Sequence, residues 1–119
     1  MPAEQSGVRP AAVYRVAVRV DQEIAEEWLE WMRTIHVPAV LDTGCFTGCV
    51  ISRQVDPSEA GPRWGFVLEY GLPSLEHFER YQARHADALR DAHTGRYAGR
   101  FEASRSIALV VDHLWPAPG

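Results

Sequence analysis

The sequence predicts an α+β domain of the ferredoxin-like class, with a four-stranded antiparallel sheet and two helices on one face. Its apolar pattern has the order β-α-β-β-α-β, with period-two alternation in the strands and three- and four-residue spacing in the helices. The length of 119 residues fits a single domain. We assign this domain to residues 12–115 and expect disordered tails at 1–11 and 116–119.

The first strand and helix are predicted between residues 13 and 44. Residues 13–20 (VYRVAVRV) alternate strictly between two faces, which is typical of a half-buried strand. Asp21 offers an N-cap, and the following helix carries an apolar stripe of Ile24, Trp28, Trp31, Met32 and Ile35. Pro38 should interrupt that helix, and a short helical piece should end at Gly44 as its C-cap.

Two strands and a turn are predicted next. Residues 45–54 (CFTGCVISRQ) indicate a second strand, in which Gly48 is a candidate bulge. The segment DPSEAGP (56–62) is rich in turn-forming residues. Residues 63–70 (RWGFVLEY) alternate again and predict the third strand.

The last helix and strand complete the order. A second helix should open at Pro73–Ser74 and carry an apolar face of Leu75, Phe78, Gln82, His85 and Leu89. Gly95 and Gly99 predict a short helical turn and a loop over 92–100. Residues 102–114 indicate the last strand.

This last strand is apolar on both faces. Ile107, Leu109 and Val111 share one face, and Ala108 and Val110 share the other. Because the helices cover only one face of the sheet, the other needs a separate cover, and a second copy of the chain is the simplest source. The pattern therefore predicts a homodimer.

Charge and composition exclude several classes of function. The net charge of -4 argues against a nucleic-acid partner. All twelve basic residues are Arg, and the absence of Lys excludes Schiff-base catalysis and a GK[ST] phosphate loop. Six Arg lie within 80–105 against three acids, while 21–59 holds eight acids against two Arg. The two segments could be solvated faces that complement each other in charge within a monomer or dimer. Alternatively, the arginine-rich second half could attract anions weakly.

Membrane association and disulfide formation are not expected. No apolar run approaches the roughly 18–20 residues of a membrane span, and residues 1–11 lack the apolar core of a secretory signal. On a strand, Cys45 and Cys49 would lie roughly 13 Å apart, too far for a disulfide. Two free thiols favour a location in the reducing cytoplasm.

His85 and His36 are the candidate catalytic residues. If the second helix is continuous, His85 lies on the same face as Phe78 and Leu89 and points at the sheet. It is then either a hydrogen-bonded core histidine or an acid/base group in a cavity between helices and sheet. His36 ends the first helix beside Met32, as a C-terminal cation or as a second group in the same cleft.

The candidate ligand-binding residues are apolar, with one cation. Trp28, Met32 and Trp64 could form the wall of a hydrophobic pocket, although aromatic side chains more often belong to the core. Arg105 shares a strand face with apolar residues and needs an acidic partner or an anionic ligand. Histidine and cysteine spacing fits no zinc site, so no metal is expected.

Two stretches carry a resemblance to a known family: EEWLEWMRTIHVPAVLDTGCF (26–46) and YQARHADALRDAHTGRYAGRFEASRSIAL (81–109). They resemble an uncharacterised bacterial domain-of-unknown-function family placed among the dimeric α/β-barrel proteins, over about residues 13–112. The matching positions are Trp28, Trp31, Met32, His36, Pro38, Thr43, Gly44, His85, Leu89, Arg90, Phe101 and Arg105. The resemblance implies the dimeric ferredoxin-like fold but no particular activity.

The wider superfamily supplies functional analogies. It includes cofactor-free and haem-degrading monooxygenases and small isomerases. Haem-degrading members use a histidine of the second helix with a Trp and an Asn. His85 and Trp64 could take the first two roles, but this chain has no Asn. We therefore expect no cofactor, with haem bound through His85 as a minor alternative.

The functional hypothesis is a small dimeric protein that binds an apolar or weakly anionic molecule in a cleft between helices and sheet. Monooxygenase-like and isomerase-like chemistry both stay open. The alternative is a non-catalytic dimerisation or regulatory module, in which the histidines are structural.

Overall fold

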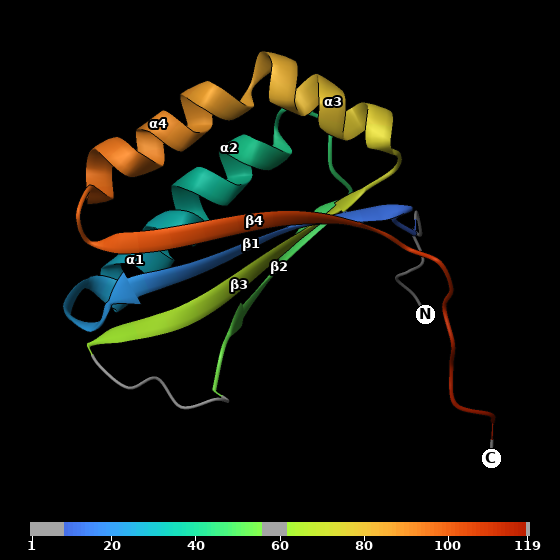
Figure 1. The fold of residues 1–119 in the computed structure, drawn as a ribbon, viewed down its shortest axis with the longest axis horizontal. Helices are drawn as coiled ribbons and strands as arrows, with labels where there is room; N and C mark the ends of the chain where they lie inside the picture. Colours follow the sequence, from blue (N-terminus) through green and yellow to red (C-terminus); the bar gives the residue numbers. More distant parts are fainter. Residues whose placement is uncertain (1–8, 56–61, 119) are drawn as a thin grey trace.

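Four strands form one sheet, and all the helices lie on one side of it (Figure 1). The computed structural model describes residues 9–55 and 62–118. Residues 1–8 and 119 of the expected tails, and 56–61 of the expected turn, lie outside the described residues. Residues 116–118 are exposed and form no helix or strand.

The sheet has the strand order β2-β3-β1-β4, and each neighbouring pair is antiparallel. The strands are β1 (Ala12–Asp21), β2 (Gly48–Arg53), β3 (Arg63–Leu72) and β4 (Phe101–Leu109). This topology confirms the predicted ferredoxin-like class. Gly48 begins β2 in regular register opposite Gly71, without the candidate bulge.

Alternation along β1 and β3 builds the floor of the core. Tyr14, Val18 and Val20 are buried on the helix side of β1, and their register partners include the equally buried Tyr70 and Phe66 on β3. The intervening residues face away from the helices. Because one face is buried, the period-two pattern fixes the register as the sequence predicted.

The first helical segment differs from its prediction at Pro38. The chain stays helical through η1 (Gln22–Ile24), α1 (Ala25–Trp31), the π-helical turn η2 (Met32–His36) and α2 (Val37–Leu41). Proline has no N–H for the α-helical bond and clashes with the preceding turn. A wider π turn before Pro38 accommodates both effects, so the helix does not end there.

Asp21 occupies the N-cap position but does not cap through its side chain. Its two carboxylate oxygens instead accept hydrogen bonds from Arg63 Nε (2.8 Å) and Arg100 Nε (2.6 Å). The predicted capping role is therefore wrong, because a two-arginine ion pair competes for the same oxygens. The C-cap predicted at Gly44 is wrong, because α2 ends at Leu41 with Asp42 as its C-cap; Gly44 follows two residues later with a positive φ of 78°, in the turn that leaves the helix.

The second helical segment breaks at a point that the sequence pattern did not indicate. It consists of α3 (Leu75–Arg84), capped by Ser74, and α4 (Ala86–Tyr97), with His85 between them at φ -132° and ψ -31°. The helix continues through Gly95, which corrects the loop predicted over 92–100. Burial of His93 and Tyr97 on α4 outweighs the roughly 1 kcal/mol by which glycine disfavours a helix.

The last strand is shorter than predicted. β4 ends at Leu109, opposite Ala12, the first residue of β1, so residues 110–114 have no strand left to pair with. They continue as an extended segment that leaves the body of the domain (Figure 1).

Neither cysteine in the structure is in a disulfide, in agreement with the prediction. Among the helices of residues 9–55 and 62–118, none has the length and apolar character needed to cross a membrane.

Candidate functional site

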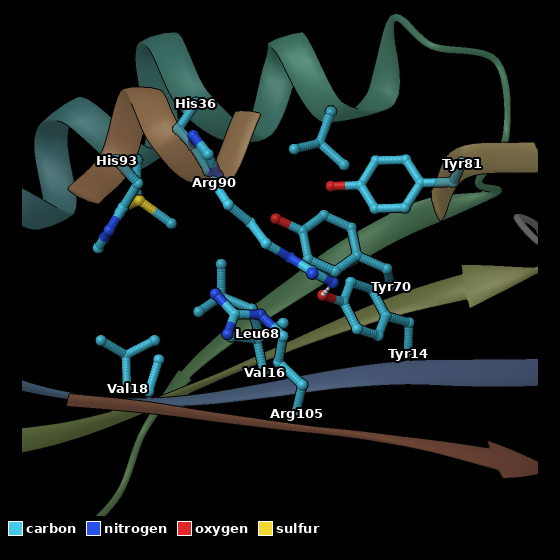
Figure 2. Close-up of a pocket in the computed structure, with 13 residues that line it drawn as sticks. Tyr14, Val16, Val18, His36, Leu68, Tyr70, Tyr81, Arg90, His93 and Arg105 are labelled. Carbon is cyan, nitrogen blue, oxygen red and sulfur yellow. Dashed lines mark hydrogen bonds between the residues drawn. The ribbon is translucent and has the colours of Figure 1, made fainter. Parts of the chain in front are cut away.

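A narrow, partly open cavity lies between the sheet and the helices (Figure 2). Its volume is about 40 Å³. At roughly 10–15 Å³ per water, it has room for a few waters or for one end of a small ligand. It is lined by Tyr14, Val16, Val18, Met32, His36, Val40, Leu68, Tyr70, Tyr81, Arg90, His93, Ala103 and Arg105.

Polar groups sit at both ends of this cavity. Figure 2 shows three tyrosines gathered at one end and two histidines at the other, with the Arg90 side chain reaching between them. Val16, Val18 and Leu68 form an apolar floor because they alternate onto the helix side of β1 and β3.

His93 is held by a hydrogen bond from a buried tryptophan. Trp28 is fully buried, and its Nε1 donates to Nε2 of His93 over 2.9 Å. An indole N–H can only donate, so Nε2 accepts, and the neutral imidazole carries its proton on Nδ1. Burial, together with His36 and Arg105 nearby, lowers the pKa of His93 to about 4.

His36 lies beside His93 because the π turn ends there. Its ring stacks on Trp31 at a centroid distance of 5.3 Å and lies 5.7 Å from the ring of His93. Burial, and then the positive charge of Arg105, lowers its pKa to about 4. Both imidazoles are therefore neutral at pH 7.

Arg90 is incompletely paired. Its Nη2 donates to the hydroxyl of Tyr14 (3.1 Å) and to Gln82 Oε1 (3.4 Å), while its buried Nε has no hydrogen-bond partner. A buried N–H of a cation without an acceptor costs free energy, and a ligand acceptor would remove that cost.

Arg105 supplies a second cation at the cavity wall and is exposed to solvent. Within the described part of the chain, Arg105 has no hydrogen bond or ion pair, and no Asp or Glu lines the cavity. Two guanidinium groups thus face a cavity without a protein counter-charge.

The hydroxyls of Tyr70 and Tyr81 at the other end are neutral donors. Burial raises the pKa of Tyr81 to about 12 and raises the pKa of Tyr70 still further. These phenols can therefore donate hydrogen bonds to an acceptor at any physiological pH.

The structure brings together some of the residues singled out in the sequence. His36, Met32 and Arg105 line the cavity. Trp28 does not reach it but positions His93. Trp64 lies at the start of β3, where the guanidinium carbon of Arg53 stands 3.8 Å from its ring centroid, and it does not line the cavity.

His85 does not line this cavity, so the cavity does not bring His36 and His85 together. The helical break at His85 changes which residues of α4 face the sheet. His93 therefore occupies the place that was expected for His85. A chemical role for His85 elsewhere stays a prediction. The four-residue spacing of Leu89, His93 and Tyr97 is the sequence signal that would have indicated His93.

Metal binding has no support in residues 9–55 and 62–118, where no three His, Cys, Asp or Glu side chains are grouped suitably for an ion. The cavity provides two imidazoles and two cations, and the latter would repel a metal ion.

The fold and cavity define a ferredoxin-like α+β domain with a basic, histidine-containing cavity between helices and sheet. Residues 11–111 match DUF4286, a domain of unknown function, and the chain belongs to that family. No curated protein matches the chain.

Solved structures resemble this fold at low sequence identity. Two dimeric ferredoxin-like proteins from uncultured marine organisms are 15% and 12% identical, with TM-scores of 0.65 and 0.63; each alignment covers 89% of this chain and 100% of the other. HapK from Hahella chejuensis is 10% identical with a TM-score of 0.64, over 90% of this chain and 99% of HapK. These similarities confirm the fold.

Proposed function

We propose that the protein binds a small organic anion, with the anionic group of the ligand held in the cavity by Arg90 and Arg105. The observation that carries the proposal is the unpartnered, buried Nε of Arg90 in a cavity that no carboxylate lines. A planar guanidinium pairs best with a carboxylate or a similar oxyanion.

The size of the cavity limits the class of ligand. About 40 Å³ accommodates a carboxylate and a few adjoining atoms, so the remaining apolar part of the ligand would lie at the open side. A haem does not fit this volume, and His85, on which the haem hypothesis rested, lies outside the cavity. The residues present therefore do not suit that cofactor.

Acid–base chemistry is the reaction class that the site supports, which favours the isomerase-like hypothesis. Neutral His36 can accept a proton from a carbon next to a bound carbonyl, while the cations stabilise the resulting enolate. The Nδ1–H of His93 is available as a donor because Trp28 occupies Nε2. Nothing in the cavity favours the monooxygenase-like alternative.

A homodimer is the second part of the proposal. Ile107 and Leu109 on β4 are 37% and 61% exposed, and two of the similar solved proteins are described as dimeric. Light scattering should give twice the 13.4 kDa chain mass. The mass of a single chain at every concentration would contradict the proposed homodimer.

We also propose a cytoplasmic location, which the two free thiols support.

Binding can be tested by calorimetry with benzoate as the probe and benzyl alcohol as its uncharged counterpart. Benzoate should bind and the alcohol should not. Arg105→Gln should weaken binding roughly 10- to 100-fold, the equivalent of losing a hydrogen bond to a charged group. Arg84→Gln, on the exposed side of α3, is the matched control and should have no effect. Equal binding of both probes would contradict the proposal.

Proton transfer can be tested by following exchange of the α-protons of phenylpyruvate in D2O by NMR. The protein should accelerate the exchange, and His36→Gln should abolish that acceleration while benzoate binding persists. If neither protein accelerates exchange but both bind benzoate, the site binds anions without catalysis, as the non-catalytic regulatory alternative requires.

A further inference from the structure

Three tyrosines present their hydroxyls to the cavity from three separate elements. Tyr14 lies on β1, Tyr70 on β3 and Tyr81 on α3, and each is only 3% exposed. In Figure 2 the three hydroxyls point in the same direction, toward Arg90 and the middle of the cavity. Buried phenols whose polar atoms face one space form a second hydrogen-bonding group beside the two arginines.

Packing holds the three rings in place. Tyr14 and Tyr70 are register partners with ring centroids 5.8 Å apart, and the Tyr81 ring lies 6.1 Å from that of Tyr14. Phe46 packs against the other two rings, at 5.1 Å from Tyr70 and 4.8 Å from Tyr81. Because these contacts fix the rings, the hydroxyls are in position before a ligand binds, which lowers the entropic cost of binding.

The three hydroxyls have unused hydrogen-bonding capacity. Within the described residues, the Tyr81 hydroxyl makes no hydrogen bond. The Tyr70 hydroxyl is hydrogen-bonded to the Cys49 thiol, which is a weak partner. The Tyr14 oxygen accepts from Arg90 Nη2 over 3.1 Å, so its own proton is available to another acceptor. This end of the cavity therefore lacks a strong acceptor.

The lining of the cavity is rich in donors and poor in acceptors. Two guanidinium groups and three phenols face it, whereas no Asp, Glu, Asn or Gln side chain of the described residues lines it. A single carboxylate satisfies the arginines but leaves the phenols without an acceptor. Burial raises the pKa of Tyr70 and Tyr81, so both stay neutral and bring no charge to offset a second carboxylate. They suit an uncharged carbonyl oxygen next to the first carboxylate.

We propose that the ligand of this cavity is a 2-oxo carboxylate. Its carboxylate is held by Arg90 and Arg105, and its keto oxygen accepts hydrogen bonds from Tyr70 and Tyr81. This inference rests on the proposed anion site and names the class of anion that the site takes. The keto carbon adjoins the carboxylate, so the two groups together span only a few atoms, in keeping with a cavity of about 40 Å³.

The shape of a 2-oxo acid matches the arrangement of the side chains. Its keto carbon is trigonal, so the keto oxygen, the carboxylate and C3 leave it in three directions. Figure 2 shows the tyrosines at one end of the cavity and the histidines at the other, with Arg90 reaching between them. With the keto oxygen at the tyrosines and the carboxylate at the arginines, C3 is directed toward the histidine end.

This placement gives the tyrosines a part in proton transfer. When His36 takes a proton from C3, the electron pair of the C3–H bond forms the C2–C3 double bond. The π pair of the carbonyl moves onto the keto oxygen, which becomes an enolate oxygen. Hydrogen bonds from Tyr70 and Tyr81 strengthen as negative charge develops on that oxygen, so both tyrosines lower the barrier.

Two probes that differ at a single position test the class of ligand. Benzoylformate has a keto group where phenylacetate has a methylene, and it has no C3 proton, so its binding is measured without turnover. In calorimetry at neutral pH, benzoylformate should bind at least about 10-fold more tightly than phenylacetate, the equivalent of one or two net hydrogen bonds. Equal affinities would overturn the inference and leave the anion site intact. Failure of both probes and of benzoate to bind would overturn both.

Phenylmalonate tests the charge of the second group. It carries a second carboxylate on the carbon that bears the keto oxygen in benzoylformate, and it should bind more weakly. Binding as tight as that of benzoylformate would show that the tyrosine end takes a carboxylate, and the inference would be wrong.

A tyrosine substitution tests the placement of the keto oxygen. Tyr81→Phe should weaken benzoylformate binding about 10-fold and leave phenylacetate binding unchanged. Tyr97→Phe is the matched control, because the Tyr97 hydroxyl donates to Glu27 Oε2 (2.6 Å) outside the cavity. It should not change the ratio of the two affinities. An equal loss of affinity for both probes in Tyr81→Phe would show that Tyr81 acts through packing, which contradicts its proposed role.

Carbon-13 NMR of benzoylformate labelled at the keto carbon gives a readout that packing alone would not move. Hydrogen bonds to the keto oxygen draw electron density from the carbon, so the bound resonance should lie downfield of the free one. The difference should shrink in Tyr81→Phe. An unshifted resonance in the unchanged protein would overturn the inference, and this measurement, like the comparison of probes, does not require Tyr81→Phe to fold.

Discussion

The indole nitrogen of Trp28 donates a 2.9 Å hydrogen bond to Nε2 of His93, which lies 65 residues later in the chain. This bond joins the core of the first helical segment to α4 and fixes the tautomer of one cavity histidine. The family resemblance indicated Trp28 but not His93, so only the structure shows why this tryptophan matters to the cavity.

Trp28→Phe should lower the free energy of unfolding by roughly 1–3 kcal/mol beyond the loss of ring contacts, because Nε2 of buried His93 loses its partner. The pKa of His93 should rise, since the donor that holds Nε2 unprotonated is gone. Denaturant unfolding and NMR titration of the imidazole measure the two effects. Trp31→Phe is the control, because its ring contacts His93 at 6.0 Å and is not the hydrogen-bond donor. Equal effects of both variants would contradict the assignment.

Acidification should destabilise the fold between pH 6.5 and about 4. His36 and His93 have an ordinary pKa of 6.5 when unfolded and about 4 when folded. Below pH 6.5 the unfolded chain therefore takes up protons that the folded chain does not, and stability falls until the folded histidines also protonate near pH 4. Because a shift of one pKa unit corresponds to 1.36 kcal/mol, each histidine should lower the free energy of unfolding by on the order of 3 kcal/mol over this range.

The measurement is urea unfolding at several pH values from 7.5 to 4.5. His93→Gln should remove about half of the pH dependence in this window. A stability that stays flat down to pH 4.5 would show that the two imidazoles are not protected from protonation.

Anion binding should be coupled to proton uptake. A bound anion next to His36 favours its protonated form and raises its pKa from about 4. By linkage, binding of benzenesulfonate, which stays ionised throughout, should tighten as the pH falls from 7.5 to 5.5. Calorimetry in buffers of different ionisation enthalpy would detect the proton uptake, and His36→Gln should reduce it. Proton release on binding would contradict the proposed arrangement.

The fold was predictable from the sequence to the extent that local pattern determines it. One face of β1 is buried, so its alternation specified both the strand and the register. The end of β4 was not predictable, because it is set by where β1 begins, a tertiary contact between Leu109 and Ala12. The π turn before Pro38 was not predictable either. Proline in a helix predicts a break from the local sequence, whereas core packing preserves the helix here.

The site was predictable only in part for a similar reason. His36, Met32 and Arg105 follow from one helix face and one strand face. His93 and Arg90 depend on the break at His85, where backbone angles of -132° and -31° rotate α4 relative to α3. A helical projection that assumes one continuous helix assigns the wrong histidine, because no proline or glycine marks the break.

Asp21→Asn should lower the melting temperature and reduce its dependence on salt. The carboxylate joins Arg63, the first residue of β3, to Arg100, just before β4, and hydrogen bonds from Arg100 and Arg63 lower its pKa. Its stabilising effect is therefore present at neutral pH and lost below about pH 4, as the carboxylate protonates. Calorimetry at low and high salt measures the melting temperature of both proteins and its dependence on salt. Glu30→Gln, which removes an exposed helical pair with Arg33, should change little.

Gly71→Ala should destabilise the fold, whereas Gly48→Ala, directly opposite on β2, should not. A Cβ at position 71 would overlap Thr47 Oγ1 and lie 3.1 Å from Pro10 Cβ, while a Cβ at position 48 has no atom within 4 Å. Overpacking of this kind costs roughly 1–3 kcal/mol, and an unobstructed Gly→Ala change is neutral or slightly stabilising. Denaturant unfolding of both variants compares them.

Thr47→Ala combined with Gly71→Ala separates the two contacts. Removal of the Thr47 hydroxyl should restore part of the lost stability, because it relieves the closer overlap and leaves the contact with Pro10. The backbone hydrogen bond from Thr47 N to the Gly71 carbonyl (2.8 Å) should persist in both variants. If Gly71→Ala is as well tolerated as Gly48→Ala, the segment before β1 does not pack against β3 as the structure places it.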